Sequence, residues 1–178
     1  MSYTDSLKDT LQALQFDADG IKQILSNPDA VSFGLITAVV AGIAQAIGTF
    51  SIFGLFFIPI TTVVGLAVVT GISHLLAKLF GGQGSYRDLF AVMSNATLAY
   101  WVTVVPGLGF VLSPLIALFL LVFSVFALKE VYSLSILKSI AILLLPGVVL
   151  TLLLVILAFA FLGGVASLFS LGALASAA

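Results

Sequence analysis

The chain has 178 residues, of which 62% are hydrophobic and only 7% are charged, and its formal net charge is −1. An ordinary soluble domain carries about 25% charged residues, so this composition excludes a globular protein with a water-facing surface and indicates a membrane protein. The absence of cysteine excludes disulfides and thiolate chemistry, and the six basic residues, offset by seven acids, form no basic surface for nucleic acid.

All formal charges fall in three patches, and a long charge-free block follows each patch. The patches cover residues 3–29, 78–88 and 129–138, and the blocks cover residues 30–77, 89–128 and 139–178. A membrane helix needs about 20 apolar residues. The first two blocks are therefore long enough for two crossings each, and the third for one crossing and a tail. The pattern predicts an all-α, five-helix transmembrane bundle over residues 30–164.

The N-terminal segment, residues 1–29, is polar and is expected to form an amphipathic helix on the cytoplasmic side. Leu7, Leu11 and Leu14 lie at positions i, i+4 and i+7 of one helix face. This face has two interpretations: contact with the membrane or the bundle, or docking of a soluble partner. Acidic residues outnumber lysines in the segment, which disfavours attraction to anionic lipid.

Glycines and prolines bound the five predicted transmembrane helices. We expect these helices at about residues 31–51, 57–80, 89–105, 110–128 and 140–162. A stripe of small residues in the first helix consists of Gly34, Ala38, Gly42 and Ala46. Such a stripe lets helix backbones approach closely in lipid. It leaves two partners open, a helix of the same chain or a second copy in a homo-oligomer.

The positive charges predict the orientation of the bundle. With five crossings, the three charge patches share one side of the membrane, and together they hold every Lys and Arg. Because basic residues favour the cytoplasmic side, we expect a cytoplasmic N-terminus. The small-residue C-terminal tail, residues 165–178, is then outside or lumenal.

A few polar side chains lie inside the predicted helices. Gln45, Asn95 and Thr97 either form interhelical hydrogen bonds or line a polar path for a solute, ion or lipid. His74, one helical turn before Lys78, is an interfacial anchor or a headgroup- or proton-sensing group. The helices contain no Asp or Glu. The sequence therefore offers no catalytic constellation, metal site or cofactor site, and we expect a protein that is not an enzyme.

The second and third patches supply the candidate surface for a partner or a lipid headgroup. The run GGQGS at 81–85 lacks the Lys-Ser/Thr of a phosphate loop, which favours a flexible turn. Ser85 and Asp88 have the spacing of a helix start. The candidate surface consists of Lys78, Gly81, Gly82, Gly84, Tyr86, Arg87, Asp88, Lys129, Glu130 and Tyr132.

Three stretches carry a family resemblance: LLAKLFGGQGSYRDLF at 75–90, ALKEVYSLS at 127–135 and ILSNPD at 24–29. They resemble junctions in the Yip domain family, the Ypt/Rab-GTPase-interacting membrane proteins, and the chain is most similar to short bacterial and archaeal members. The resemblance implies five helices, a cytoplasmic N-terminus and no enzymatic activity. The chain lacks the long N-terminal region and the Asp-Leu-Tyr-Gly-Pro signature of eukaryotic relatives, which argues against a GTPase partner.

These observations lead to two functional hypotheses. The first is a non-enzymatic scaffold or adaptor that docks a membrane or cytoplasmic protein, or shapes the membrane, through its cytoplasmic loops. The alternative is an oligomeric transporter or channel with a polar path through Gln45 and Asn95. In either case the protein is an integral membrane protein surrounded by lipid. Its expected location is the plasma membrane in a prokaryote and the endoplasmic reticulum or Golgi in a eukaryote.

Overall fold

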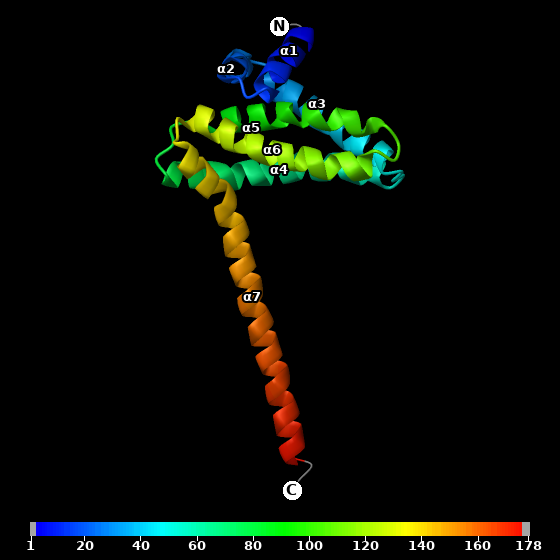
Figure 1. Cartoon of the computed structure of the whole chain (residues 1–178), viewed down its shortest axis with the longest axis vertical. Helices are drawn as coiled ribbons and strands as arrows, with labels where there is room; N and C mark the ends of the chain where they lie inside the picture. The colour runs from blue at the N-terminus through cyan, green and yellow to red at the C-terminus, as the bar shows by residue number, and fades with distance from the viewer. Residues whose placement is uncertain (1–2, 176–178) are drawn as a thin grey trace. The chain divides into compact units, whose positions relative to one another are not determined.

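The computed structural model describes the backbone of residues 3–175 and the side chains of residues 3–149, 151–152 and 154–157. Every element in this range is helical, which confirms the all-α prediction. The elements in chain order are α1 (Tyr3–Leu14), α2 (Ala18–Ser26), α3 (Ala30–Gly48), α4 (Gly54–Leu79), α5 (Tyr86–Ala96), the 3₁₀ helix η1 (Thr97–Val104), α6 (Gly109–Tyr132) and α7 (Ile136–Ala175) (Figure 1). The chain divides into two compact units, Met1–Ile142 and Leu143–Ala178.

Four helices are long and apolar enough to cross a membrane: α3, α4, α6 and the Ile136–Leu157 part of α7. The fifth expected helix, over 89–105, is instead divided into α5, with 11 residues, and η1, with 8 residues. Hydroxyl groups favour the tighter winding, because Thr97 and Thr103 each donate to the carbonyl three residues earlier at 2.6 Å. Neither piece alone is long enough to cross hydrocarbon.

Helix α3 is the centre of the first unit and packs against α4, α5 and η1. The small-residue stripe makes these contacts within the chain. A β-carbon on Gly34 would collide with the Ser94 side chain of α5, and one on Gly42 would meet the backbone of Pro59 in α4 at 2.5 Å. Ala38 and Ala46 are buried as well. Of the two partners that the sequence left open, the structure places helices of the same chain against this stripe.

Two helix boundaries differ clearly from the sequence expectation. Helix α4 begins at Gly54, so Pro59 lies in its second turn rather than its first. Helix α7 continues to Ala175, through most of the segment expected to be a tail, because its Ala and Leu residues favour helix strongly. The last three residues of that expected tail lie outside the described residues.

Candidate functional site

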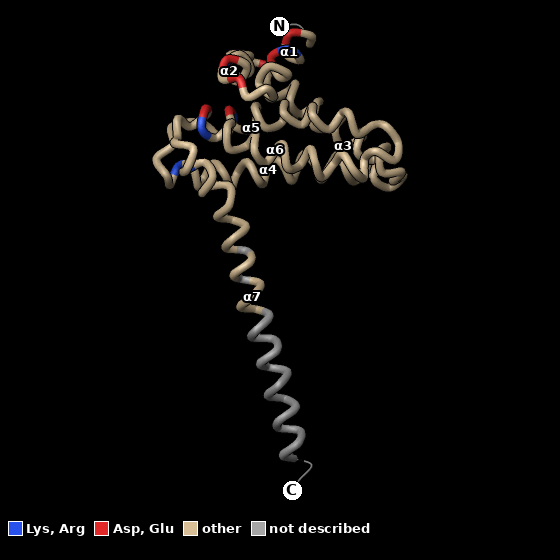
Figure 2. The backbone as a smooth tube through the Cα atoms, viewed as in Figure 1, with Lys and Arg blue, Asp and Glu red and all other residues tan. Residues whose placement is uncertain are grey.

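The second and third charge patches meet at one end of the bundle, and we call residues 78–88 and 129–138 the charged junction. Figure 2 shows charged positions, coloured along the backbone, at the end where α4 and α6 finish and α5 begins. The backbone amide of Gln83 donates to the Tyr132 carbonyl at 3.2 Å, and the Lys138 ammonium donates to the Phe80 carbonyl at 3.0 Å. Two segments that are far apart in the sequence therefore form one surface.

Glycines allow the loop after α4 to lie directly on the end of α6. Gly81 has a φ of +85°, which favours glycine. A β-carbon on Gly82 would meet the Tyr132 side chain at 2.9 Å, and one on Gly84 would meet the Val131 carbonyl at 2.4 Å. These contacts leave no space for larger side chains. The three glycines of the candidate surface therefore set the path of the loop.

The predicted helix start at Ser85 is present at the end of this loop. The Ser85 hydroxyl oxygen accepts a hydrogen bond from the Asp88 backbone amide at 3.1 Å and donates to the Asp88 carboxylate at 2.7 Å. An N-cap of this kind satisfies an amide that the helix itself leaves unpaired. It fixes where α5 begins and holds Asp88 beside the loop.

Tyr132 is the buried centre of the junction, with 1% of its surface exposed. Its hydroxyl donates to the Ser85 carbonyl at 3.2 Å and lies 2.6 Å from Nδ1 of His74. The hydroxyl has only one proton, so which group donates in the bond to His74 depends on the tautomer of the imidazole. Tyr86 packs its ring against His74 at 6.1 Å. This network joins α4, the loop and α6 through side chains as well as backbone.

Four cationic side chains surround this centre and are exposed: Lys78, Arg87, Lys129 and Lys138. Lys129 pairs with the adjacent Glu130 at 2.6 Å. The only other ion pair among the described residues joins Lys22 and Asp19, outside the junction. Three of the four junction cations therefore lack an acidic partner in the part of the chain that the structure describes.

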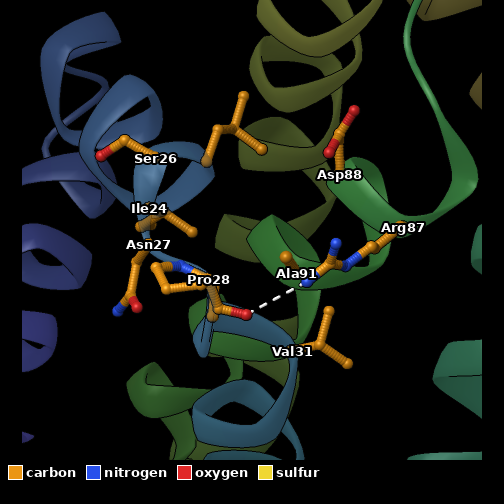
Figure 3. Close-up of a pocket in the computed structure, with 10 residues that line it drawn as sticks. Ile24, Ser26, Asn27, Pro28, Val31, Arg87, Asp88 and Ala91 are labelled. Carbon is orange, nitrogen blue, oxygen red and sulfur yellow. Dashed lines mark hydrogen bonds between the residues drawn. The ribbon is translucent and has the colours of Figure 1, made fainter. Parts of the chain in front are cut away.

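A cleft of about 120 Å³ lies beside the junction, between the α2–α3 turn and the start of α5. It is lined by residues that include Ile24, Asn27, Pro28, Val31, Arg87 and Ala91. Arg87 reaches across it and donates to the Pro28 carbonyl at 3.1 Å, whereas Asp88 points away (Figure 3). The guanidinium keeps further donors for a partner's acceptor groups.

The three polar residues predicted to line a path are not brought together. The Asn95 amide is engaged within the bundle, where it donates to the carbonyls of Ala30 at 2.9 Å and Ala91 at 2.7 Å. Thr97 donates to the carbonyl of Ser94 at 2.6 Å. Gln45 is half-buried on α3, fifteen residues after Ala30 and so about 22 Å along the helix. No described contact connects Gln45 to the other two.

A polar seam joins the N-terminal helices to the bundle. It consists of Ser6, Asp9, Thr10, Asn27 and Asn95, each of which is at most 8% exposed. The Asn27 amide donates to the Ser6 hydroxyl at 3.0 Å, and the Thr10 hydroxyl, which donates to the Ser6 carbonyl at 2.8 Å, lies 3.5 Å from Oδ1 of Asn95. The space between these groups has no room for a water molecule.

Asp9 is the one seam residue with an unsatisfied atom. Its Oδ2 is buried and has no hydrogen-bond partner. Desolvation by burial raises the pKa of Asp9 above the ordinary 3.8, and repulsion from Asp5 adds to this, while attraction to Lys8 opposes it. The seam is therefore polar and closely packed, with one carboxylate in an unfavourable position.

The sequence analysis did not identify the seam, although a signal for it was present. Ser6, Asp9, Thr10 and Ala13 lie at positions i, i+3, i+4 and i+7, which also define one helix face. The three leucines of the same helix satisfy that spacing equally well. Because it is hydrophobic, the leucine face was expected to contact the membrane, the bundle or a soluble partner, whereas the structure buries the small and polar face.

Comparison with known proteins gives one result for this chain. The family model of the Yip1 domain matches residues 18–159, which include α2 to α6 and the charged junction. No curated protein and no solved structure matches the chain.

Proposed function

The chain belongs to the Yip1 domain family, and we propose that it is a non-enzymatic, multi-pass membrane scaffold whose charged junction docks a protein partner. Family membership and four apolar helices of membrane-spanning length identify it as a membrane protein. The family consists generally of membrane proteins without enzymatic activity. The proposal also includes five membrane crossings and a cytoplasmic position for the junction.

We further propose that α5 and η1 together make the fifth crossing. They follow each other without a break, and 11 residues of α-helix plus 8 of 3₁₀ helix rise about 32 Å. The hydrocarbon core is about 30 Å thick. With five crossings the junction and the N-terminus share the cytoplasmic side, since all the basic residues lie there.

One observation carries the docking proposal: the junction has a fixed shape while its cations remain exposed. The loop is held by Tyr132 at the end of α6, which bonds to Gln83 and Ser85, and by Lys138 at the start of α7, which bonds to Phe80. A surface that is ordered before binding loses less conformational entropy when a partner arrives. Exposed cations without acidic partners attract an acidic protein surface and increase the association rate.

The structure favours a scaffold over the alternative of a transporter. The Asn95 amide uses both of its N–H donors within the bundle. The space beside Asn95 is too small for a water molecule. A transport path needs polar groups that are available to the passing solute or to water, and none of the described contacts supplies such a group at Asn95.

Site-specific photocrosslinking in native membranes tests the docking proposal. A photoreactive residue would replace Gln83 or Ser133, two exposed and uncharged positions of the junction, with the exposed Gly65 of α4 as the control. We expect the two junction positions to capture the same protein and the control position not to capture it. The double change Arg87→Ala and Lys78→Ala should then reduce capture at least about fivefold, because two attractive charges are lost.

A second control tests whether the position of the lost positive charge matters. Lys8→Ala also removes an exposed positive charge, but it lies outside the junction, so capture should remain unchanged. The proposal fails if the two junction positions capture no common protein, or if capture survives the loss of both Arg87 and Lys78.

A further inference from the structure

Helix α1 presents three distinct edges, and only one of them is buried in the protein. The buried edge contains Ser6, Asp9, Thr10 and Ala13. Lys8 and Gln12 form a second, polar edge, and Tyr3, Leu7, Leu11 and Leu14 form a third, apolar edge. We call this third group the leucine edge. Leu11 on this edge is 52% exposed although it is entirely apolar.

The α1–α2 turn lies beside a membrane-spanning helix and not above its end. The ring of Phe16, at the turn, lies 5.7 Å from Phe119, 6.1 Å from Phe123 and 5.7 Å from Phe126. All three partners belong to α6, which is long and apolar enough to cross the membrane. Phe123 precedes the last residue of α6 by nine positions, about 13 Å along the helix axis.

A second contact, to α5, places α1 at a similar distance from the level of the junction. The hydroxyl of Thr10, in the middle of α1, lies 3.5 Å from Oδ1 of Asn95 in α5. Asn95 follows Arg87 of the junction by eight positions, about 12 Å along α5. Helix α1 is therefore beside the bundle, about 12 Å from the level of the junction charges toward the membrane interior.

Contacts made by α1 and α2 show which way the leucine edge faces. Tyr3, at one end of that edge, packs its ring against Phe33 of α3 at 4.5 Å. Phe33 belongs to another helix of membrane-spanning length. On α2, the pKa of Lys22 is raised chiefly by its hydrogen bond to Asp19, with a smaller contribution from Glu130 of the junction. The apolar edge thus adjoins the spans, and the charged side of α2 approaches the junction.

From this geometry we infer that the leucine edge of α1 is covered by lipid acyl chains of the leaflet on the junction side. The apolar surface of α6 continues onto this edge through Phe16, and the described part of the protein leaves 52% of Leu11 exposed. An interfacial helix of this kind sinks its apolar side about 5–10 Å into the boundary of headgroups and acyl chains. The edge is then a lipid contact and not a docking site for a soluble protein.

Spin labelling of the full chain in lipid vesicles tests this inference directly. The chain has no cysteine, so single labels at Leu11→Cys, Lys8→Cys and Leu118→Cys report one position each. Lys8 represents the polar edge of α1, and Leu118, 63% exposed on α6, represents a lipid-facing position. Oxygen concentrates in lipid and a nickel chelate concentrates in water, so the ratio of the two accessibilities measures the surroundings of each label.

We expect the ratio at Leu11 to exceed that at Lys8 at least about threefold and to approach that at Leu118. A label at Leu7→Cys should behave like the label at Leu11. The inference is overturned if the label at Leu11 is as accessible to the nickel chelate as the label at Lys8. Broadening between Leu11 labels that disappears on dilution with unlabelled chain would also overturn it, because a second copy would then cover the edge. The purified chain needs no partner for this measurement, so the result is independent of the docking proposal.

Discussion

The two ends of the bundle are closed by different chemistry. The charged junction uses backbone and side-chain hydrogen bonds around Tyr132 and leaves its cations exposed. The opposite end, residues 49–53 and 105–109, carries no formal charge. Phe50, Ile52 and Phe53 there are 70%, 78% and 83% exposed. We call it the apolar end.

The apolar end is held by close packing of backbones. The Gly107 amide donates to the Gly48 carbonyl at 3.0 Å, and Gly109 lies against Gly48 so closely that neither has space for a β-carbon. Exposed aromatic and aliphatic side chains are compatible with a position at the membrane boundary. Under the proposed function, the junction recognises a partner, whereas the apolar end only closes the bundle.

The largest effect is expected at the apolar end, from Gly48→Ala. The added methyl group would collide with the Thr103 carbonyl. Such overpacking should lower the free energy of unfolding by about 2–3 kcal/mol. Denaturation in detergent micelles, followed by the fluorescence of Trp101, the only tryptophan, measures this change.

Gly65→Ala in α4 is the matched control for Gly48→Ala. Nothing lies within 4 Å of a β-carbon at Gly65, so the change should stabilise the helix by roughly 0.5–1 kcal/mol. Equal effects at the two glycines would show that the apolar end is not held by close backbone contact.

At the junction we expect a smaller effect, from Tyr132→Phe. The change removes the hydroxyl that bonds to the Ser85 carbonyl and His74. Leaving these groups unpaired should destabilise the protein by about 1–2 kcal/mol. Amide hydrogen exchange over residues 81–88 should accelerate as well, because the loop loses its attachment to α6.

Tyr100→Phe, in η1, provides the comparison for Tyr132→Phe. No described hydrogen bond involves the Tyr100 hydroxyl, so we expect a change below about 0.5 kcal/mol. If Tyr132→Phe left the exchange of residues 81–88 unaltered, the junction would not be held in the way that the structure indicates.

The sequence predicted most of the helices, and also that one end of the bundle is charged and the other uncharged, because both features follow from local composition. Runs without charge mark the spans, and the glycines at 81–84 mark the loop. The division between α5 and η1 was not predictable in the same way. It depends on hydroxyl bonds of Thr97 and Thr103, and on a bond from the Trp101 indole to the Thr37 carbonyl at 3.2 Å. The last of these is a tertiary contact with no local signal.

The candidate site was also predicted only in part. Exposed cations and turn glycines can be read along the chain, and the structure brings them together at the junction. The seam was not predicted because a charged residue such as Asp9 is normally exposed to solvent. Only the tertiary structure places it near Asn27 and Asn95. Whether a polar side chain is exposed or buried depends on packing, which a single helix pattern does not determine.

The seam offers a test of how α1 docks on the bundle, through Asp9→Asn. In the native protein the raised pKa of Asp9 means that the docked α1 binds its proton more tightly than the released helix. Docking is therefore most stable at low pH and weakens as the pH rises from about 3.8 through the raised value. At neutral pH, Asp9→Asn should strengthen docking by about 1 kcal/mol, since it removes a buried, unpaired carboxylate oxygen.

The mobility of a spin label at Leu7→Cys measures this docking. It would be followed between about pH 4 and pH 8, the range over which a carboxyl group with a raised pKa titrates, in the native and Asp9→Asn backgrounds. The label should loosen with rising pH only when Asp9 is present. Asp19→Asn changes an exposed carboxylate on α2 and should leave the pH response intact. A pH response that persists in Asp9→Asn would assign the titration to another group.

The smallest effect on stability is expected for Lys129→Gln, and it separates folding from recognition at the junction. Lys129 is 45% exposed and pairs with Glu130 at 2.6 Å, and a surface pair contributes about 0.5 kcal/mol or less. Thermal unfolding should therefore be almost unchanged, whereas partner capture by a photoreactive residue at Gln83 should fall severalfold, because the attraction between charged surfaces is weakened. Lys22→Gln, which breaks the corresponding exposed pair on α2, should alter neither measurement. If Lys129→Gln reduced capture only in proportion to a loss of stability, the exposed cations would serve the fold alone, and the contrast between a recognition end and a closing end would disappear.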